Sequence, residues 1–251
     1  MTVGPQLAGR VAVVTGGSRG IGLATASALM THGVDVTICG RGEESLRAAR
    51  LQIERVPGST SGEGPVAGRL ETLKTDVRDA AQVQRVFDAT VERFGGLDIL
   101  VNNAGVGGFS EVAAQSPDEW RQIIDTNLTG VFYCCQAAIP LFRRRRGGWI
   151  INISSLAGQH PFARGAAYCA SKAGLNAFSE ALMQEVRYDD IRVSSIMPGS
   201  VDTKFGAPGS DPSAAWKLSP ADVAQVVIDL LSHPGRCLPS RVEMRPTKPR
   251  K

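Results

Sequence analysis

Short apolar runs alternate along the chain with segments in which apolar residues recur at helical spacing. The first run, residues 11–14 (VAVV), ends at a glycine-rich turn; a helical pattern then extends to Gly33, and a second run covers 34–39 (VDVTIC). Apolar runs of this length that are bounded by glycine are typical of buried strands. The pattern therefore predicts one unit of strand, helix and strand.

The same rhythm continues through the rest of the chain. It predicts helices over 43–54, 80–94 and 219–232, and strands over 70–74, 97–101, 149–154 and 191–197. Residues 116–119 (SPDE) read as a capping box with proline at the first helical position, which predicts the start of a long helix. Because short apolar strands alternate with helices, we expect an α/β fold in which helices cover both faces of a parallel sheet.

One segment breaks the rhythm. Residues 56–68 (VPGSTSGEGPVAG) are rich in glycine, serine and proline, so we expect a surface loop insertion between the second helix and the third strand. The chain has 251 residues, 43% of them hydrophobic, which suits a single compact domain over 1–251.

The charge balance argues against some classes of partner. There are 28 basic and 24 acidic residues, and a surplus of +4 does not indicate nucleic acid or an anionic membrane. The basic run 143–146 follows an apolar helical pattern and precedes Gly147, so we interpret it as a helix C-terminus closed by glycine, with anion binding as the alternative. The uncharged stretch 126–142 is shorter than the roughly 20 residues of a membrane helix and is interpreted as a helix buried on more than one side.

The first residues show no basic flank followed by a long apolar core, so we expect neither a signal peptide nor an anchor. The cysteines are odd in number and lack paired CxxC spacing, so we expect them to be reduced and mostly buried, with no metal site. They are Cys39, Cys134, Cys135, Cys169 and Cys237. A cytoplasmic enzyme or binding protein is the expectation.

The glycine-rich turn after the first strand is the first candidate site. Residues 15–22 (TGGSRGIG) follow a strand and open a helix, so backbone amides and the helix N-terminus can cradle a pyrophosphate. The spacing of Gly16, Gly20 and Gly22 departs from the commoner GxGxxG pattern, and a tight turn without a ligand is the alternative.

The end of the second strand bears on the choice of dinucleotide. A carboxylate that binds the adenosine ribose is expected about 20 residues after the glycine turn. There the chain has Gly40 and Arg41 (CGRG), and Arg19 lies in the glycine turn itself. These two cations suit a 2'-phosphate, so the sequence favours NADP(H) over NAD(H).

Over roughly residues 7–232 the chain resembles the short-chain dehydrogenase/reductase family, because a set of motifs occurs in order. These motifs are TGGSRGIG (15–22), DV (76–77), NNAG (102–105), Asn127 in TNLTG, ISS (153–155), YCASK (168–172) and PGSVDT (198–203). The resemblance implies a Rossmann-type, doubly wound sheet of seven parallel strands. It also implies catalytic roles for Asn127, Ser155, Tyr168 and Lys172. The implied NADP(H) contacts are Gly16, Ser18, Arg19, Gly20, Ile21, Gly22, Arg41, Asp76, Val77, Asn103, Ala104, Gly105, Tyr168, Lys172, Pro198, Gly199, Val201 and Thr203.

The spacing of Tyr168 and Lys172 has a chemical reading. Residues four apart lie on one helix face, so the ammonium group can lie near the phenol and also reach a ribose. Bringing a phenol from pKa ~10 to near 7 requires about 4 kcal/mol, which this cation and an oxidised nicotinamide can together supply. By resemblance, Ser155 hydrogen-bonds the substrate oxygen, and Asn127 holds a water that links Lys172 to solvent. A packed helix aromatic is the alternative for Tyr168.

The resemblance thus implies hydride transfer between the nicotinamide and a carbonyl or alcohol, with Tyr168 as general acid or base. A small-molecule carbonyl or alcohol is the expected substrate. Two alternatives stay open: a 3-oxoacyl-[acyl-carrier-protein] reductase-like enzyme, and a non-catalytic NADP-binding regulatory relative. Many relatives end in a strand followed by Asp-Gly-Gly, which this chain lacks, so the first alternative is less favoured.

Three further expectations concern the surroundings of the site. His160 lies in the loop between Ser155 and Tyr168 and is a candidate for substrate contact. Residues 204–217, with Phe205 and Trp216, occupy the position of the family's substrate lid, and 245–251 form a tail. The family often pairs the helix over 126–142 and the helix after Tyr168 across two-fold axes, so we expect a homotetramer, with a homodimer second.

Overall fold

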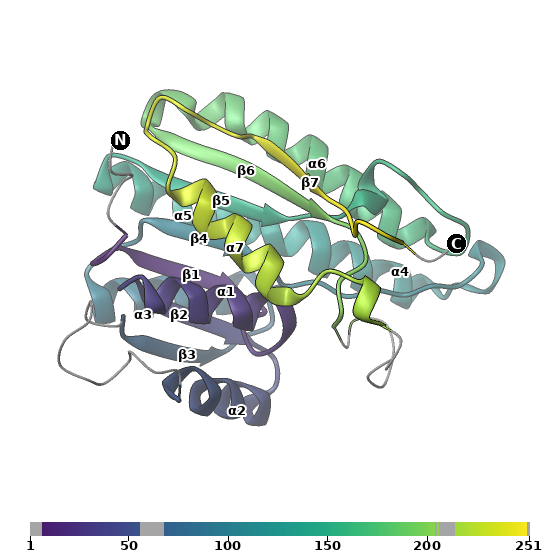
Figure 1. The fold of residues 1–251 in the computed structure, drawn as a ribbon, viewed down its shortest axis with the longest axis horizontal. Helices are drawn as coiled ribbons and strands as arrows, with labels where there is room; N and C mark the ends of the chain where they lie inside the picture. The colour runs from purple at the N-terminus through teal and green to yellow at the C-terminus, as the bar shows by residue number, and fades with distance from the viewer. Residues whose placement is uncertain (1–6, 56–67, 204, 206–213, 250–251) are drawn as a thin grey trace.

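The computed structural model describes residues 7–55, 68–203, 205 and 214–249 (Figure 1). Seven strands form one sheet in the order β3-β2-β1-β4-β5-β6-β7, and every neighbouring pair is parallel. The expected doubly wound α/β fold with seven parallel strands is therefore confirmed. The strands are β1 Val11–Thr15, β2 Asp35–Gly40, β3 Leu70–Lys74, β4 Ile99–Asn102, β5 Gly148–Ile153, β6 Ile191–Pro198 and β7 Arg241–Met244.

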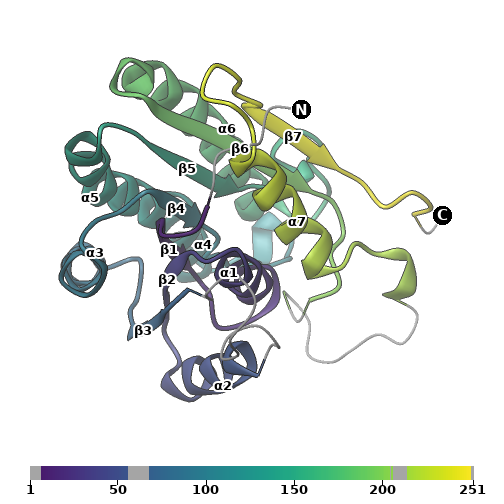
Figure 2. The same cartoon turned by 60° about the vertical axis from the view of Figure 1, so that its left-hand side comes forward.

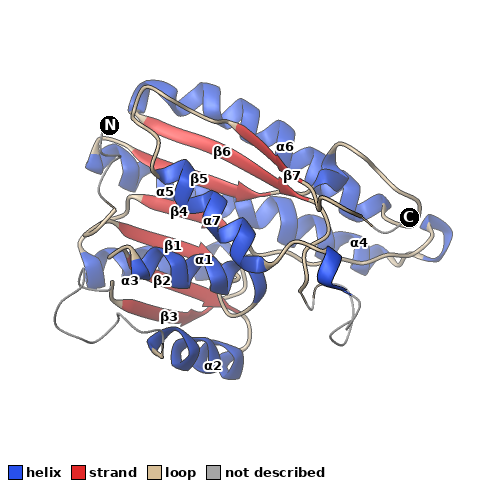
Figure 3. Cartoon of the chain, in the orientation of Figure 1, coloured by secondary structure: helices blue, strands red, loops and turns tan. Residues whose placement is uncertain are grey.

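Helices cover both faces of the sheet, as Figures 2 and 3 show. Because side chains alternate along a strand, Ala12 and Val14 belong to the core beneath α1, α2 and α7, whereas Val13 belongs to the core beneath α3, α5 and α6. The helices are α1 Gly20–Thr31, α2 Glu43–Glu54, α3 Ala80–Phe94, α4 Pro117–Ile124, α5 Gly130–Arg145, α6 Ala166–Val186 and α7 Pro220–Leu231. No helix within these described ranges is both long enough and apolar enough to cross a membrane.

The long helix expected from residue 116 onward is divided by a wider turn. Ser116 caps α4 by accepting a hydrogen bond from the Glu119 amide at 3.1 Å, but the predicted capping box is incomplete, because the Glu119 carboxylate accepts from the Ser110 hydroxyl and not from the Ser116 amide. A π-helical turn, Asp125–Thr129, then separates α4 from α5 and contains Asn127. Such single-turn π insertions are frequent at functional sites, and here the turn aims the Asn127 side chain into the protein.

One expectation about α5 is wrong, and a second is not met within the single chain. Its last turn is closed by Arg146 in the left-handed region (φ 58°), where a glycine was expected. In addition, only one side of α5 is buried in the single chain, because Phe132, Gln136 and Pro140 are exposed on its outer face. The apolar residues of the inner face pack the helix against the sheet.

The C-terminal part of the chain supplies the seventh strand. β7 pairs with β6 at the edge of the sheet, with Ser195 opposite Arg241 and Pro198 opposite Met244. Where these two strands end, the Gly199 amide donates to the Met244 carbonyl oxygen at 2.8 Å. Residues 56–67, 204, 206–213 and 250–251 lie outside the described residues. They include almost all of the expected loop insertion, most of the expected lid and the end of the tail.

All five cysteines are free, as expected. Four are buried, and Cys237 is half-buried.

Candidate active site

A hollow of about 1330 Å³ opens at the carboxyl ends of the strands. In parallel α/β sheets this is the edge at which ligands bind. The hollow joins the glycine turn and Arg41 to Ser155, Tyr168 and Lys172, although these residues are distant in sequence. Of the residues predicted for the site, only Gly22 and Asn127 do not line it; Gly22 lies against Asn103 and Asn127 bonds to Val106, and both of these partners line the hollow.

The glycine turn has the backbone geometry of an anion cradle. Gly16 (φ 64°) and Gly20 (φ 56°) adopt left-handed conformations that favour glycine. A Cβ atom on Gly22 would lie 2.5 Å from the Gly16 carbonyl oxygen and would also collide with the side-chain amide nitrogen of Asn103, so only glycine fits there. Asn103 in turn donates to the carbonyl oxygens of Thr15 and Gly16, at 2.9 and 3.1 Å, which fixes the turn above the start of α1.

The adenosine end of the hollow carries positive charge. Arg41 follows β2, and Arg19 immediately precedes α1; both line the hollow. Asp76 lies nearby, but Arg78 binds its carboxylate at 2.6 Å. This hydrogen bond to Arg78 lowers the pKa of Asp76, and the charge of Arg41 lowers it further. Asp76 thus stays ionised and engaged with Arg78, while Arg19 and Arg41 face the hollow.

Ser155 and Tyr168 meet at the other end. Ser155 follows β5, and its hydroxyl oxygen accepts a 3.1 Å hydrogen bond from the Ala157 amide. Tyr168 lies in the first turn of α6 and shares a hydrogen bond with the Ser155 hydroxyl. Burial raises the pKa of Tyr168 above its ordinary value, and the hydrogen bond to Ser155 only partly offsets this rise. The expected lowering of this pKa depends on Lys172 together with an oxidised nicotinamide, and it stays a prediction.

Lys172 lies one helical turn further along α6. Its ammonium nitrogen is 5.9 Å from the centroid of the Tyr168 ring and donates to the Ile153 carbonyl oxygen at 2.8 Å. The side chain is buried, and burial lowers the pKa of Lys172 to about 8. At neutral pH it thus remains mostly a cation, and it lines the hollow beside the phenol.

Asn127 is fully buried in the π-helical turn. Its side-chain oxygen accepts from the Val106 amide at 2.8 Å, and its nitrogen donates to the Val106 carbonyl oxygen at 2.9 Å and to the Ser171 hydroxyl at 3.0 Å. Ser171 donates to the Tyr168 carbonyl oxygen at 2.7 Å. Asn127 therefore ties the turn after β4 to the first turn of α6, which carries the phenol.

Side chains that no sequence pattern indicated line the far end of the hollow. They include Phe109, Phe162 and Arg245, which come from loops and from the segment after β7. His160 also lines the hollow, and its Nε2 lies 3.0 Å from the Arg245 guanidinium, which also binds Glu243. Loops have no periodicity, so these positions give no signal in the sequence alone.

Comparison with known proteins adds an independent line of support. The family model of short chain dehydrogenases matches residues 10–212. An uncharacterized oxidoreductase of Staphylococcus saprophyticus is 34% identical over 241 residues, 96% of this chain and 99% of the relative. A metagenomic short-chain oxidoreductase, solved in complex with NADP, is 35% identical with a TM-score of 0.82, covering 98% of this chain and 100% of that one. An alcohol dehydrogenase of the archaeon Thermococcus sibiricus, complexed with 5-hydroxy-NADP, is 30% identical with a TM-score of 0.84. The match covers 96% of this chain and 98% of that one.

Proposed function

The chain belongs to the short-chain dehydrogenase family of oxidoreductases, and from this premise we propose that it uses NADP(H) to interconvert a carbonyl compound and the corresponding secondary alcohol. The observation that carries the proposal is the convergence of Ser155, Tyr168 and Lys172 in the hollow that also contains the glycine turn. A proton donor, a hydrogen-bond donor and a cation thereby lie beside a place for a dinucleotide.

The residues present fit the dinucleotide. The left-handed Gly16 and Gly20 and the start of α1 suit the pyrophosphate, because their amide groups face an anion without obstruction by a Cβ atom. Arg19 and Arg41 suit a 2'-phosphate. The complexes of the two structural neighbours with NADP and 5-hydroxy-NADP support this assignment. Bound there, NADP(H) supplies or accepts the hydride.

The remaining contacts of the dinucleotide follow from the family motifs and the shape of the hollow. We propose that Asp76 and Val77 lie at the adenine, Asn103 to Gly105 beside a ribose, and Thr203 near the nicotinamide amide. All of these residues line the hollow.

In our proposal Tyr168 is the general acid and base. In the reducing direction its hydroxyl donates a proton to the substrate oxygen, and in the oxidising direction the phenolate takes the proton back. Ser155 donates a hydrogen bond to the same oxygen and stabilises its developing charge. The raised pKa of Tyr168 keeps the phenol protonated at neutral pH, which is the form that reduction requires.

Lys172 and Asn127 support this chemistry in different ways. The ammonium group of Lys172 favours the phenolate, through space, and is close enough to the hollow to hold a ribose hydroxyl. Asn127 positions α6 through Ser171. Its side-chain oxygen also lies close to Gly105, 3.4 Å from the point where a side chain at that position would begin. We propose that a water held near Asn127 links Lys172 to solvent, as the family resemblance implies.

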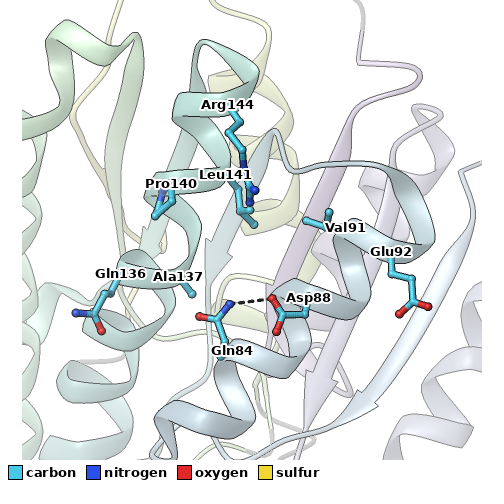
Figure 4. Close-up of a pocket in the computed structure, with 9 residues that line it drawn as sticks. All are labelled: Gln84, Asp88, Val91, Glu92, Gln136, Ala137, Pro140, Leu141 and Arg144. Atoms are coloured by element: carbon cyan, nitrogen blue, oxygen red, sulfur yellow. Dashed lines mark hydrogen bonds between the residues drawn. The ribbon is translucent and has the colours of Figure 1, made fainter.

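We further propose that the enzyme assembles as a homotetramer, with a homodimer as the second possibility. The outer face of α5 exposes Phe132, 43% of whose surface is accessible, together with Gln136 and Pro140. Beside this face, a hollow of about 390 Å³ is lined by residues of α3 and α5, among them Asp88 and Pro140 (Figure 4). A second copy would cover the apolar surface.

The free cysteines support a reducing compartment such as the cytoplasm.

The test is a panel of aldehydes, ketones and secondary alcohols, followed by the absorbance of the reduced nicotinamide. We expect consumption of NADPH with carbonyl compounds and formation of NADPH with alcohols. Binding of NADPH without turnover of any member would favour the non-catalytic alternative and would contradict the proposal.

A further inference from the structure

We propose that the substrate carries an aromatic ring next to its carbonyl group, and that Phe109, Phe162 and Phe205 hold this ring. The inference rests on the proposed function, because it takes Tyr168 as the residue that meets the carbonyl oxygen. It adds the chemical class of the substrate, which the family resemblance leaves open.

The first observation is a continuous row of rings around the phenol, made of Phe162, Phe109, Tyr168 and Phe205. The centroids of Phe162 and Phe109 are 5.8 Å apart, with the planes at 45°. Phe109 meets Tyr168 edge to face at 5.8 Å and 74°, and Phe205 meets Tyr168 from another direction at 5.7 Å and 56°. These separations are those at which aromatic rings attract one another.

The second observation is that the rings are seated directly on the backbone at two glycines. A Cβ atom on Gly107 would lie 2.7 Å from the Phe205 ring and 3.2 Å from the Phe109 ring. A Cβ atom on Gly165 would lie 2.5 Å from the Phe162 ring. The backbone therefore supports each ring from one side and leaves the opposite side open.

The third observation is where the open sides lie. Phe109, Phe162 and Phe205 are 41%, 48% and 40% exposed, and all three line the hollow that contains Tyr168. Exposed apolar surface of this extent on one wall marks a place that an apolar ligand covers. Rings inclined at different angles offer both edges and faces, so they attract a planar ring more strongly than a saturated one of equal size.

The proposal predicts a specific ratio of substrates. Acetophenone and cyclohexyl methyl ketone have the same carbon skeleton, but only the first carries an aromatic ring. Phe109→Leu, Phe162→Leu and Phe205→Leu keep an apolar side chain and remove the ring. Each is expected to lower the ratio of kcat/KM for acetophenone to that for cyclohexyl methyl ketone about 2- to 10-fold. The change in this ratio cancels the different intrinsic reactivity of the two ketones.

Tyr188→Leu is the matched control. Tyr188 is 91% exposed and follows the far end of α6, roughly 27 Å or more from Tyr168 at 1.5 Å per helical residue. Its replacement removes an exposed ring of similar size, and the ratio is expected to stay within experimental error of the unmodified enzyme.

A binding measurement separates this inference from the proposed reaction. Benzamide and cyclohexanecarboxamide are not reduced, so their effect on the melting temperature in the presence of NADP⁺ reports binding alone. Benzamide is expected to raise the melting temperature more, and the phenylalanine variants are expected to remove the difference. Equal binding of the two amides, or an unchanged kcat/KM ratio in all three variants, would overturn the inference. If the unmodified protein binds benzamide more tightly than cyclohexanecarboxamide but turns over no ketone, the result would instead count against the proposed reaction.

Discussion

The ammonium group of Lys172 donates a 2.8 Å hydrogen bond to the carbonyl oxygen of Ile153, the last residue of β5. Lys172 is only 5% exposed, and burial lowers its pKa to about 8. Burying a charge costs free energy that one hydrogen bond does not recover. The buried cation in the first turns of α6 thus lowers the stability of the fold, which is typical of a residue with a functional role.

This arrangement predicts that Lys172→Met stabilises the protein without cofactor at pH 7. The pKa of Lys172 is lower in the folded than in the unfolded protein. The free-energy cost of burying the charged ammonium group is therefore fully present below pH 8 and decreases as the pH rises toward 10.5. The variant is expected to gain on the order of 2 to 3 kcal/mol at pH 7, roughly 4 to 12 °C in melting temperature. Thermal unfolding at pH 7 and pH 10 checks this, and the gain is expected to shrink at pH 10. A lower melting temperature of the variant at both pH values would refute the prediction.

The second prediction concerns the 2'-phosphate. Arg41→Ala or Arg19→Ala removes a charge-assisted contact worth about 1.5 to 3 kcal/mol, so NADPH binding is expected to weaken roughly 10- to 150-fold. NADH lacks this phosphate, and its binding is expected to change little. Fluorescence titration measures both constants. Arg47→Ala, an exposed position on α2 that does not line the hollow, is the control. Equal affinity of the unmodified protein for NADH and NADPH would show that Arg41 is merely a solvated residue.

The third prediction reverses the preference for the dinucleotide. A Cβ atom on Gly40 would lie 3.4 Å from the Ser18 hydroxyl oxygen, an ordinary contact, so a side chain fits there. Gly40→Asp combined with Arg41→Ala places a carboxylate that accepts from a free ribose hydroxyl and repels a phosphate. The ratio of kcat/KM for NADH to that for NADPH is expected to rise above one. A double variant that still prefers NADPH would contradict the assignment of this end of the hollow.

The fourth prediction tests the assembly. Phe132→Asp puts a charge on the exposed apolar face of α5, where a second copy is proposed to pack. Light scattering after size exclusion is expected to show a tetramer for the unmodified protein and smaller species for the variant. Tyr188→Asp, a charge at a site that is 91% exposed, is expected to leave the assembly intact. A monomeric unmodified protein at micromolar concentration would rule out the proposed tetramer.

Much of the fold could be predicted from the sequence because its elements have strong periodicity or strong end signals. Residues 43–54 and 80–94 were expected to be helical, and α2 and α3 occupy these ranges. β7 had no such signal: its exposed Arg241 and Glu243 alternate with half-buried residues at the edge of the sheet. Only the family resemblance implied a seventh strand, and the apolar pattern could not place it.

Site residues could be predicted where their spacing along one helix makes them neighbours. They could not be predicted where a property depends on burial, or where a residue lies in a loop. The helical spacing of Tyr168 and Lys172 correctly placed the two side chains together. The sequence could not show that burial raises the pKa of Tyr168. Nor could it bring Phe109 and Phe162 to the phenol, because both lie in segments without periodicity.

The proposed reaction depends on one hydroxyl group, so Tyr168→Phe tests it most directly. The variant keeps the ring and its contacts with Phe109 and Phe205, and loses the proton donor and the hydrogen bond to Ser155. The measurement is kcat/KM for NADPH-dependent carbonyl reduction, with the dissociation constant of NADPH determined on the same preparations. General acid catalysis by Tyr168 predicts that kcat/KM falls roughly 10²- to 10⁴-fold while NADPH binding is retained. Turnover within about threefold of the unmodified enzyme would contradict the catalytic role of Tyr168, since such a loss is far smaller than that of a general acid.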